Sequence, residues 1–313
     1  MLAPYLGGVL VLIVVPALVS LGLAFMHYDG LTRPVWAGLR NFRFFFIDPL
    51  ETIAIRNSLY FTALAVPLRL GIALGLALLL ARRGLGLYRA AVTVPTVIPD
   101  VAYALVWLWV FNPLYGPVNA VLAALGLPTP GWLADPASAK LVFVAMSLLQ
   151  IGEGFVVLLV GVRSVPRELY AAAVVDGAGP LALVRTITLP ALAPWLMLLT
   201  YRDVILSFQY TFAPSMLMTQ GDPYYSTLFL PWLVYEEAFD NLRYGMSGAI
   251  MTVQFLISGV LVTGLAVVFR WWQTKDERRR TKANWTTDDG RTTNGEGQGP
   301  VRRPTRDDRR PKA

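Results

Sequence analysis

Six long apolar stretches constrain this chain more than any other feature of its sequence. A helix that crosses a membrane needs about 20 mostly apolar residues. Six segments meet this requirement: 2–26, 58–81, 90–111, 141–162, 191–217 and 244–269. Lipid offers no hydrogen-bond partner to the backbone, so each segment must satisfy its own polar groups as a helix. The predicted fold class is therefore all-α, a polytopic membrane protein with six transmembrane helices.

The composition agrees with a membrane protein and excludes several classes of function. Of the 313 residues, 55% are hydrophobic and only 15% are charged, whereas average soluble domains have about 25% charged residues. The chain has no cysteine and one histidine, His27. This excludes a disulfide framework, a zinc finger and a thiol nucleophile, together with most histidine-based catalytic or metal sites. Neither a catalytic residue nor a metal ligand is predicted.

The positive charge is concentrated at the C-terminal end. Residues 1–269 carry 14 Lys and Arg against 13 Asp and Glu, whereas residues 270–313 carry 13 against 7. The second segment is rich in Thr, Asn, Gly and Pro, and it cannot bury enough apolar surface to offset the entropy lost on ordering. We predict a transmembrane domain at 1–269 and a disordered basic cytoplasmic tail at 270–313. No RNA-binding fingerprint accompanies the tail, so nucleic acid is not an expected partner.

The distribution of Lys and Arg between the loops predicts the orientation. Twelve lie in the loops and membrane-proximal tail on one side and six on the other, and positively charged loops stay in the cytoplasm. We predict a multi-pass protein of the cell membrane, in contact with lipid, with both termini cytoplasmic. The first span is too long for a signal peptide and lacks its positively charged start. The chain begins directly at this span, which favours a start further upstream.

Five ionisable residues are predicted near the middle of the membrane. Each lies some 9 to 12 residues from the inner end of its helix, which is about 14–18 Å and close to the centre of a ~30 Å hydrocarbon core. An uncompensated charge there costs at least ~2.5–3.5 kcal/mol. These side chains are therefore expected to face the bundle interior, a partner subunit or a water-filled cavity. They are Arg69, Asp100, Glu153, Arg202 and Asp203.

Two interpretations of these charges remain open. In the first, the two arginines pair with the carboxylates and fix helix packing. Arg202 and Asp203 point about 100° apart on a helix and are not expected to pair chiefly with each other. In the second, the charges line a solute pathway in which Asp100 and Glu153 are the principal residues, and the surplus carboxylate accepts a solute hydroxyl. Nearby prolines could kink the spans for gating, although proline is common in membrane helices: Pro67, Pro95 and Pro99.

The inner loop between the fourth and fifth predicted spans has the clearest local pattern. Pro166 suits a first helical turn, and Glu168 follows where the helix dipole favours an acid. Gly177 can end the helix in a left-handed conformation. Pro180 restarts a helix, and Pro190 breaks or kinks it before the next span. The alanine-rich face of this short surface helix would let the backbone of a partner approach closely, unlike the basic and bulky faces usual for an interfacial helix.

The same loop carries a family resemblance. The run Glu168-Leu-Tyr-Ala-Ala-Ala-x-x-Asp176-Gly177-Ala178, followed by Ile187-Thr-Leu-Pro190, resembles the EAA loop of ABC-importer permeases. Further matches lie in order at loop positions over almost the whole membrane domain: Trp36-Ala-Gly-Leu-Arg-Asn-Phe-Arg43, Asn112-Pro-Leu-Tyr-Gly-Pro-Val-Asn119, Trp132-Leu-x-Asp135-Pro136 and Thr219-x-Gly-x-Pro223. Together they make the chain similar to the carbohydrate-uptake subfamily, the relatives of the maltose and glycerol-3-phosphate permeases.

The resemblance implies a type I ABC-importer permease fold and an alternating-access mechanism. It implies a second homologous permease subunit, two ABC ATPase subunits and an extracytoplasmic solute-binding protein as partners, and a sugar or related polar solute as cargo. The loop at 164–190 would dock on an ATPase and couple its closure to the pore. The coupling residues carried over from the motif are Glu168, Ala171, Ala172, Asp176 and Gly177.

The chain has no phosphate-binding loop of the GxxxxGK[ST] type, because none of its four lysines follows a glycine. It is therefore predicted to be a pore subunit and not an enzyme, without a cofactor of its own, and a partner ATPase would bind ATP and Mg²⁺. An ion-coupled secondary transporter is the alternative, although the internal repeats usual for that class are not evident. Where the family commonly has Gly-Gly before the outer proline, this chain has Gln220-Gly221-Asp222.

Overall fold

The structure is a computed structural model of the whole chain, and it describes residues 2–82 and 84–288. The chain divides into two units, residues 1–265 and residues 266–313. The elements of the first part of the chain are α1 (Leu2–Val9), η1 (Leu10–Val14), α2 (Val15–Leu23), β1 (Met26–His27), β2 (Val35–Trp36), α3 (Arg40–Ile47), α4 (Pro49–Leu80), α5 (Gly86–Thr93), η2 (Val94–Val97), α6 (Asp100–Val110) and α7 (Pro117–Ala124).

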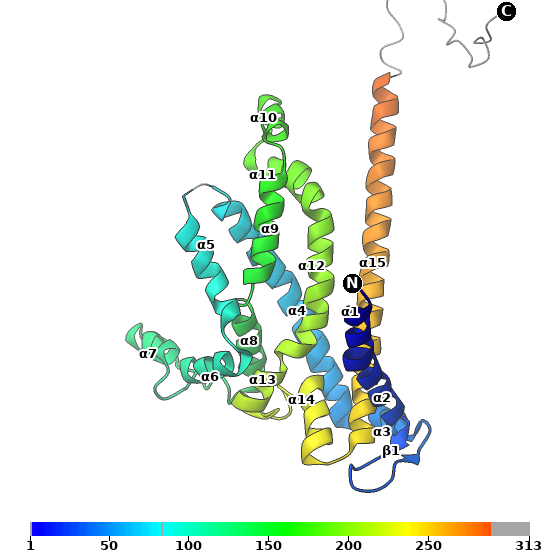
Figure 1. Cartoon of the computed structure of the whole chain (residues 1–313). Helices are drawn as coiled ribbons and strands as arrows, with labels where there is room; N and C mark the ends of the chain where they lie inside the picture. The colour runs from blue at the N-terminus through cyan, green and yellow to red at the C-terminus, as the bar shows by residue number, and fades with distance from the viewer. Residues whose placement is uncertain (1, 83, 289–313) are drawn as a thin grey trace, which may run out of the picture. The chain divides into compact units, whose positions relative to one another are not determined.

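The remaining elements are α8 (Pro136–Ser147), α9 (Gly152–Ser164), α10 (Arg167–Val175), α11 (Pro180–Leu183), η3 (Val184–Thr188), α12 (Leu189–Tyr210), α13 (Phe212–Pro214), η4 (Ser215–Thr219), α14 (Leu230–Tyr235), η5 (Glu236–Asp240) and α15 (Tyr244–Asp288). Figure 1 shows α10 and α11 at one end of the helical bundle, and β1, α3 and α14 at the opposite end. The two ends of the spans thus carry different sets of loops.

The described residues contain six candidate membrane spans. Four are helices at Ala3–Leu23, Pro49–Leu80, Pro180–Thr219 and Tyr244–Trp271, and two are bent pairs that each count as one span. One pair joins α5 and η2 to α6 with a bend of 101°, and the other joins α8 to α9 with a bend of 48°. The predicted all-α, polytopic fold is confirmed. The small exception is the antiparallel pairing of β1 with β2.

The first break has a clear cause in the sequence. Pro99 precedes the first turn of α6 and has no N–H to donate, and the preceding Ile98 is extended with ψ of 128°, as expected for a residue before proline. The second break, over residues 148–151, contains no proline. It is followed by Gly152, where a Cβ atom would lie 2.9 Å from the Cα of Thr93. Glycine therefore lets the second broken span pack directly against the first.

Helix α4 is the centre of the fold. It contributes to three apolar clusters, first through Ala54 beside α14 and α15, then through Phe61 and Ala65 beside α6 and α8, and finally through Ala73 and Ala77 beside α9 and α12. Small residues allow helix backbones to approach closely in a membrane, where packing drives association. α4 also continues straight through Pro67, so that proline does not break its span.

The motif residues of the loops cap and tie local structure. Asn41 donates through its amide to the carbonyls of Ala24 and Met26, each at 2.9 Å. Asn119 accepts a 2.8 Å hydrogen bond from the indole of Trp132, and Asp135 accepts from the N–H of Ser138 at the start of α8. Such Asn and Asp bonds replace those that the backbone lacks in turns and helix starts. The resemblance outside the EAA loop is therefore largely a set of turn and cap residues.

Two polar residues of α4 anchor the segment before α14. The Asn57 amide donates to the carbonyls of Tyr225 and Leu228 at 2.9 and 2.8 Å, and the Ser58 hydroxyl accepts from the N–H of Leu230 at 3.1 Å. Both side chains are buried. Irregular backbone inside a membrane domain is tolerated where protein groups satisfy it, and these two residues do so here.

Two successive residues are left-handed in the outer loop that departs from the family pattern. Gln220 has φ of 52° and Gly221 has φ of 90°, so both adopt the left-handed conformation that favours glycine. A non-glycine residue pays about 1–2 kcal/mol for it. The Thr227 hydroxyl donates to the Asp222 carbonyl at 2.7 Å and holds the following turn closed.

Two expectations about helix ends change in detail. Of the break or kink predicted at Pro190, the break is wrong, because residues 180–219 form one candidate span; the π-helical turn η3 directly before α12 is typical of a kink. The segment from 270 to 288, expected to be disordered, continues α15 as helix, and six of its 19 residues are Lys or Arg, which are good helix formers. Residues 289–313 of the predicted tail lie outside the described residues.

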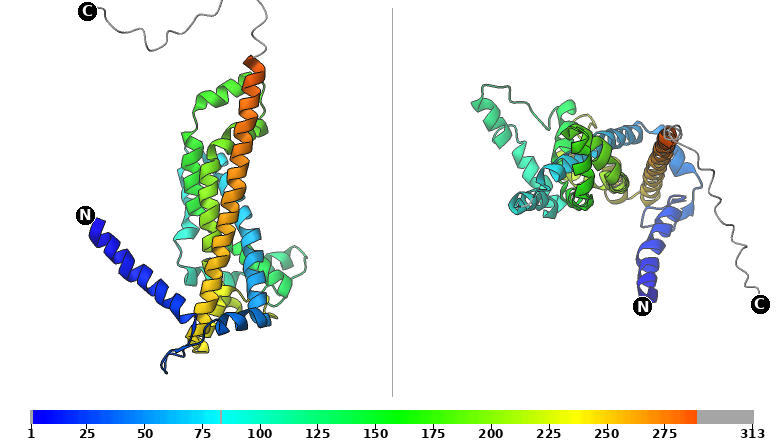
Figure 2. Two further views of the ribbon diagram at one scale, coloured as in Figure 1. Left: turned by 90° about the vertical axis from the view of Figure 1, so that its right-hand side faces the viewer. Right: turned by 90° about the horizontal axis from the view of Figure 1, so that it is seen from above.

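The first span makes few contacts within the chain. Figure 2 shows α1 and α2 leaning away from the bundle of α4, α9 and α12, and no residue of the apolar helix at Ala3–Leu23 is buried. An apolar helix with this much exposed surface must face lipid or another protein.

We expect Asn57→Ala to destabilise the membrane domain. It leaves the buried Leu228 carbonyl without its donor, whereas the Tyr225 carbonyl keeps the N–H of Leu228. An unpaired buried group costs about 1–3 kcal/mol, which corresponds to a decrease of several degrees in the unfolding temperature at about 2–4 °C per kcal/mol. Thermal unfolding of the purified protein in detergent measures it. Asn112→Ala is the control, because its bonds to Leu114 and Tyr115 are local and exposed. Equal effects of the two variants would contradict the anchoring role of Asn57.

Candidate functional site

Four of the five charges predicted near the middle of the membrane form one connected group. The Arg69 guanidinium, only 2% exposed, lies with Nε 3.7 Å from Oδ2 of Asp203. Asp203 also accepts a 3.2 Å hydrogen bond from Nη1 of Arg202, and Arg202 pairs in turn with Glu153. The group contains two positive and two negative charges, so each ion has a compensating neighbour in a region where an isolated charge is costly.

Arg69 also ties the ion group to a break in the helices. Its Nη2 donates a 3.2 Å hydrogen bond to the carbonyl of Gln150, one of the backbone groups between α8 and α9 that has left helical geometry. Its guanidinium carbon lies 4.5 Å from the centroid of the Tyr210 ring, a favourable cation–π arrangement. The buried guanidinium of α4 thus contacts both α12 and the break between α8 and α9.

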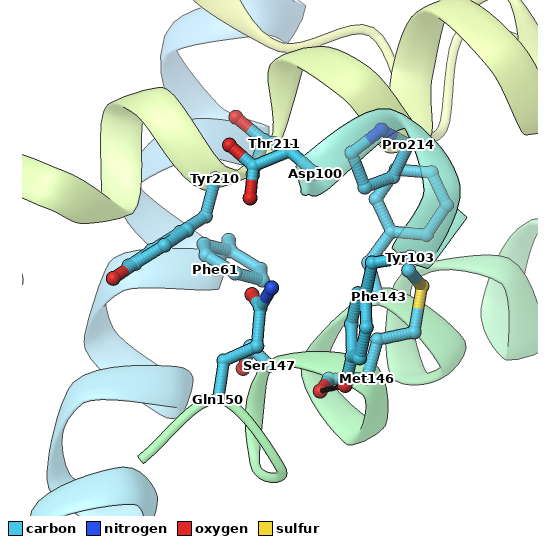
Figure 3. A pocket seen from close by; sticks show the side chains of 10 residues that line it. All are labelled: Phe61, Asp100, Tyr103, Phe143, Met146, Ser147, Gln150, Tyr210, Thr211 and Pro214. Atoms are coloured by element: carbon cyan, nitrogen blue, oxygen red, sulfur yellow. Dashed lines mark hydrogen bonds between the residues drawn. The ribbon is translucent and has the colours of Figure 1, made fainter. Parts of the chain in front are cut away.

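Asp100 lies beside this group without an ion-pair partner among the described residues. It lines a small pocket of about 20 Å³, enough for about one water molecule. Figure 3 shows the Asp100 carboxylate and the Gln150 and Tyr210 side chains around this pocket. Its walls are mostly aromatic and apolar, with a few polar groups: Phe61, Tyr103, Phe143, Met146, Ser147, Thr211 and Pro214.

Both exposed carboxylates stand at the start of a half-helix. Asp100 is in the first turn of α6 and Glu153 in the first turn of α9, directly after the two breaks. The N-terminus of a helix carries partial positive charge and stabilises a nearby carboxylate, by roughly 0.3–1 kcal/mol in exposed cases. The breaks therefore create the places where these two acids are tolerated. The Glu153 side chain is 66% exposed, so it projects away from the rest of this chain.

The structure joins four of the five predicted residues and places Asp100 beside them. Arg202 and Asp203, predicted not to pair chiefly with each other, do interact, but each also has another partner, Glu153 for Arg202 and Arg69 for Asp203. Sequence reasoning missed Gln150 and Tyr210. The signal for Gln150 was a polar residue in an apolar run just before Gly152, whereas Tyr210 has no signal that separates it from other aromatic residues of the spans.

The alanine-rich loop helix predicted from the sequence is α10. Pro166 precedes it as the capping residue, one position earlier than expected. Gly177 has φ of 83°; its N–H donates to the Val174 carbonyl at 3.0 Å, and the N–H of Ala178 donates to the Ala173 carbonyl at 2.9 Å. These two bonds are a Schellman motif, which requires a left-handed residue and so favours glycine. The predicted left-handed helix end is confirmed.

The predicted coupling residues lie on the exposed surface of this loop. Glu168, Ala171, Ala172, Asp176 and Gly177 are all exposed. Two contacts attach the loop to the spans. The Tyr170 hydroxyl lies 2.9 Å from that of Thr188, and Arg163, at the end of α9, donates to the carbonyl of Ala81 at the end of α4. α10 therefore presents its alanines outward while its base is held by α4, α9 and η3.

Neither the ion group nor the loop offers a metal site. No group of three or more His, Cys, Asp or Glu able to hold a metal ion occurs in the part of the chain that the structure describes. The two carboxylates of the ion group, Asp203 and Glu153, already contact arginines. The arrangement suits hydrogen bonding to a polar molecule or ion pairing between packed helices. It lacks the paired nucleophile and base of a reaction centre.

Comparison with known proteins identifies the class. Residues 68–282 match the family model described as "Binding-protein-dependent transport system inner membrane component". The chain is 31% identical over 278 residues to the probable ABC transporter permease protein YesP of Bacillus subtilis, covering 87% of this chain and 89% of that protein. It is 28% identical over 274 residues to the sn-glycerol-3-phosphate transport system permease protein UgpA of Brucella abortus, with 87% and 92% covered.

A solved structure agrees with the fold. A chain of a bacterial alginate ABC transporter, crystallised with an alginate pentasaccharide-bound periplasmic protein, superposes with a TM-score of 0.75 at 22% identity, covering 85% of this chain and 91% of that one. The chain belongs to the family of inner-membrane components of binding-protein-dependent transport systems. The predicted ABC-importer permease, a membrane pore subunit and not an enzyme, is confirmed in preference to a secondary transporter.

We expect the two sides of the buried ion pair to respond unequally to substitution. Asp203→Leu leaves Arg69 buried without a carboxylate and should cost about 3–5 kcal/mol. Arg69→Met should cost less, because Asp203 keeps Arg202 as a partner. The unfolding temperatures of the two purified variants measure the difference. Equal decreases in unfolding temperature would contradict the prediction that Arg202 compensates Asp203 when Arg69 is replaced.

Proposed function

We propose that this chain forms one half of the translocation pathway of an ATP-driven importer for a sugar or related polar solute. It would work with a second homologous permease, two ABC ATPase subunits that bind ATP and Mg²⁺, and an extracytoplasmic solute-binding protein. Its relatives include a glycerol-3-phosphate permease and a chain of an alginate ABC transporter crystallised with a periplasmic protein, which supports a hydroxylated solute, an ABC transporter and a binding protein. Both termini and the loop at 164–190 would face the cytoplasm.

The observation that carries the proposal is the exposed helix α10. It stands at the end of the bundle opposite the outer loops (Figure 1), with its alanines uncovered and its end fixed by the Gly177 cap. A small-residue face of this kind fits into a cleft of a partner protein because its backbone can approach closely. Glu168, Ala171, Ala172, Asp176 and Gly177 would form the contact with the ATPase.

The surface with the exposed charges supports a pathway between two permeases. Glu153 and Asp100 lie at breaks within the spans and are exposed in this chain, and charged groups at such depth face protein or water and not lipid. The apolar first span also lacks a cover in this chain, which a second permease would provide. We infer that the face with these two carboxylates lines the pathway.

The charge of this face favours a neutral hydroxylated solute. Arg69 and Arg202 are balanced by Asp203 and Glu153, which leaves Asp100 as a surplus acceptor. A carboxylate accepts hydrogen bonds from hydroxyl groups, and such charge-assisted bonds are about twice as strong as neutral ones. The solutes named for two relatives, glycerol-3-phosphate and the acidic polysaccharide alginate, are anionic and would be repelled by this group, so we infer that the solute of this chain differs from theirs in charge.

The proposed transport cycle couples α10 to the charged face. Closure of the ATPases on ATP would draw the loop helices together, and the attached spans α9 and α12 would follow. These spans carry Glu153 and Arg202. Movement of the loop would therefore open the pathway outward to the solute that the binding protein delivers.

We expect Gly177→Val to uncouple ATP hydrolysis from uptake in the assembled, reconstituted transporter, because a β-branched residue is strained at φ of 83°. Solute uptake per ATP hydrolysed is the measurement. Gly179→Ala is the matched control, since Gly179 has φ of −74° and open space around its Cβ position. Retained coupling in Gly177→Val would count against the role of the loop.

We expect Asp100→Asn and Glu153→Gln to impair uptake while assembly stays normal. A lost charge-assisted hydrogen bond is worth about 1.5–3 kcal/mol, which is roughly 10- to 100-fold in apparent affinity. Uptake rates at varied solute concentration test this, with subunit composition checked by gel filtration. Unchanged kinetics in both variants would remove these residues from the pathway.

A further inference from the structure

A second cavity lies at the end of the bundle opposite α10. It has a volume of about 280 Å³ and lies where the turn after α2, helix α3 and the starts of α4 and α15 meet. We call it the outer pocket. Its acidic and arginine lining residues, which carry the argument, are Asp29, Arg40, Asp48, Glu51 and Arg243, and His27, Tyr28 and Asn41 also line it.

Glu51 is the unusual member of this lining. It is only 4% exposed, and its Oε2 atom has no hydrogen-bond partner among the described residues. A buried carboxylate without a donor is costly, so native structures normally pair it. Glu51 is therefore a buried acceptor that lines a cavity and lacks its partner.

The nearest neighbours of Glu51 are themselves acidic and supply no positive charge. Asp48 and Glu237 repel its negative charge, and Asp48 hydrogen-bonds to it, which two carboxyl groups can do only by sharing a proton. Arg243, the basic residue on the far wall, already pairs with Glu237. Arg40 lies over the Phe44 ring, with its guanidinium carbon 5.4 Å from the ring centroid, and makes no ion pair within the described residues.

A further carboxylate adds to the negative charge of the pocket. Asp29 accepts hydrogen bonds from the N–H and hydroxyl of Thr32 and from the N–H of Leu31, and these bonds lower its pKa to about 2. It is therefore ionised under all ordinary conditions. Asp48 caps α4 by accepting from the N–H of Leu50 at 2.9 Å. The carboxylates of the pocket and of Glu237 outnumber the two arginines.

We propose that the outer pocket receives the positively charged side chain of a Lys or Arg on the solute-binding protein, with Glu51 as its principal acceptor. This rests on the proposed function, which places the pocket on the side where that protein docks. A cation would take the place of the proton between Asp48 and Glu51 and would compensate the surplus of carboxylates, and the volume of the pocket admits a long side chain. The described residues lack the donor cluster that a metal ion would need. An amine-bearing lipid headgroup is the competing occupant.

The test uses the complete transporter in lipid nanodiscs and its binding protein. The readout is the concentration of binding protein that half-maximally stimulates ATP hydrolysis. Glu51→Gln should raise this concentration roughly 10- to 100-fold, the value of a charged hydrogen bond, and should weaken its dependence on salt. The control is Asp240→Asn, which removes an exposed carboxylate from η5 without altering the pocket lining and should behave like the wild type.

A second measurement starts from the wild-type transporter and uses Glu51→Gln only as its control. Methylguanidinium chloride, a mimic of the arginine head group, should raise the half-maximal concentration more than sodium chloride of equal ionic strength, and this difference should vanish in Glu51→Gln. Wild-type values for assembled Glu51→Gln and Asp48→Asn, together with no specific effect of methylguanidinium, would overturn the proposal.

The competing outcomes are distinguishable. If Glu51→Gln matters only in nanodiscs that contain phosphatidylethanolamine and leaves the half-maximal concentration unchanged in phosphatidylcholine, a lipid headgroup occupies the pocket and the proposal is wrong. If the binding protein fails to stimulate even the wild-type transporter, the proposed function itself fails, and the proposal fails with it.

Discussion

The bond between the Arg69 guanidinium and the Gln150 carbonyl is the interaction on which the arrangement of the spans depends. Backbone groups that leave helical geometry inside a membrane must find partners within the protein. Arg69 supplies one from the central helix α4, and Asp203 then compensates its charge. Asn57 and Ser58 serve the segment before α14 in the same way. One continuous helix thus provides the polar groups that allow its neighbours to be irregular.

The breaks also explain why carboxylates can stand exposed at this depth. Each acid occupies the start of a half-helix, where the peptide dipoles favour negative charge. An unbroken span would place Asp100 or Glu153 in mid-helix without this compensation. Each break in a span therefore has two effects. It creates a helix N-terminus that stabilises a carboxylate, and it places that carboxylate where a polar solute would meet it in the proposed pathway.

Much of the fold was predictable from the sequence, because spans depend on apolar length and loops on turn residues. The left-handed end of α10 followed from Gly177 alone, and the first break from Pro99. The second break was not predictable, since it depends on the packing of Gly152 against another span and on a donor 81 positions earlier in the chain. The five charges were found as a set, but their pairing was not, because side-chain length let Arg202 reach both Glu153 and Asp203.

The chain around Pro190 connects the loop to the ion pairs. The π-helical turn η3 directly precedes this proline, and residues 180–219 form one candidate span. Its near end adjoins α10, and Arg202 and Asp203 lie along its length. Helices bend at π-turns and at prolines, and this span has η3 and Pro194 between the loop and the ion pairs. The proposed transport cycle therefore has a place to bend between the contact with the ATPase and the charged face.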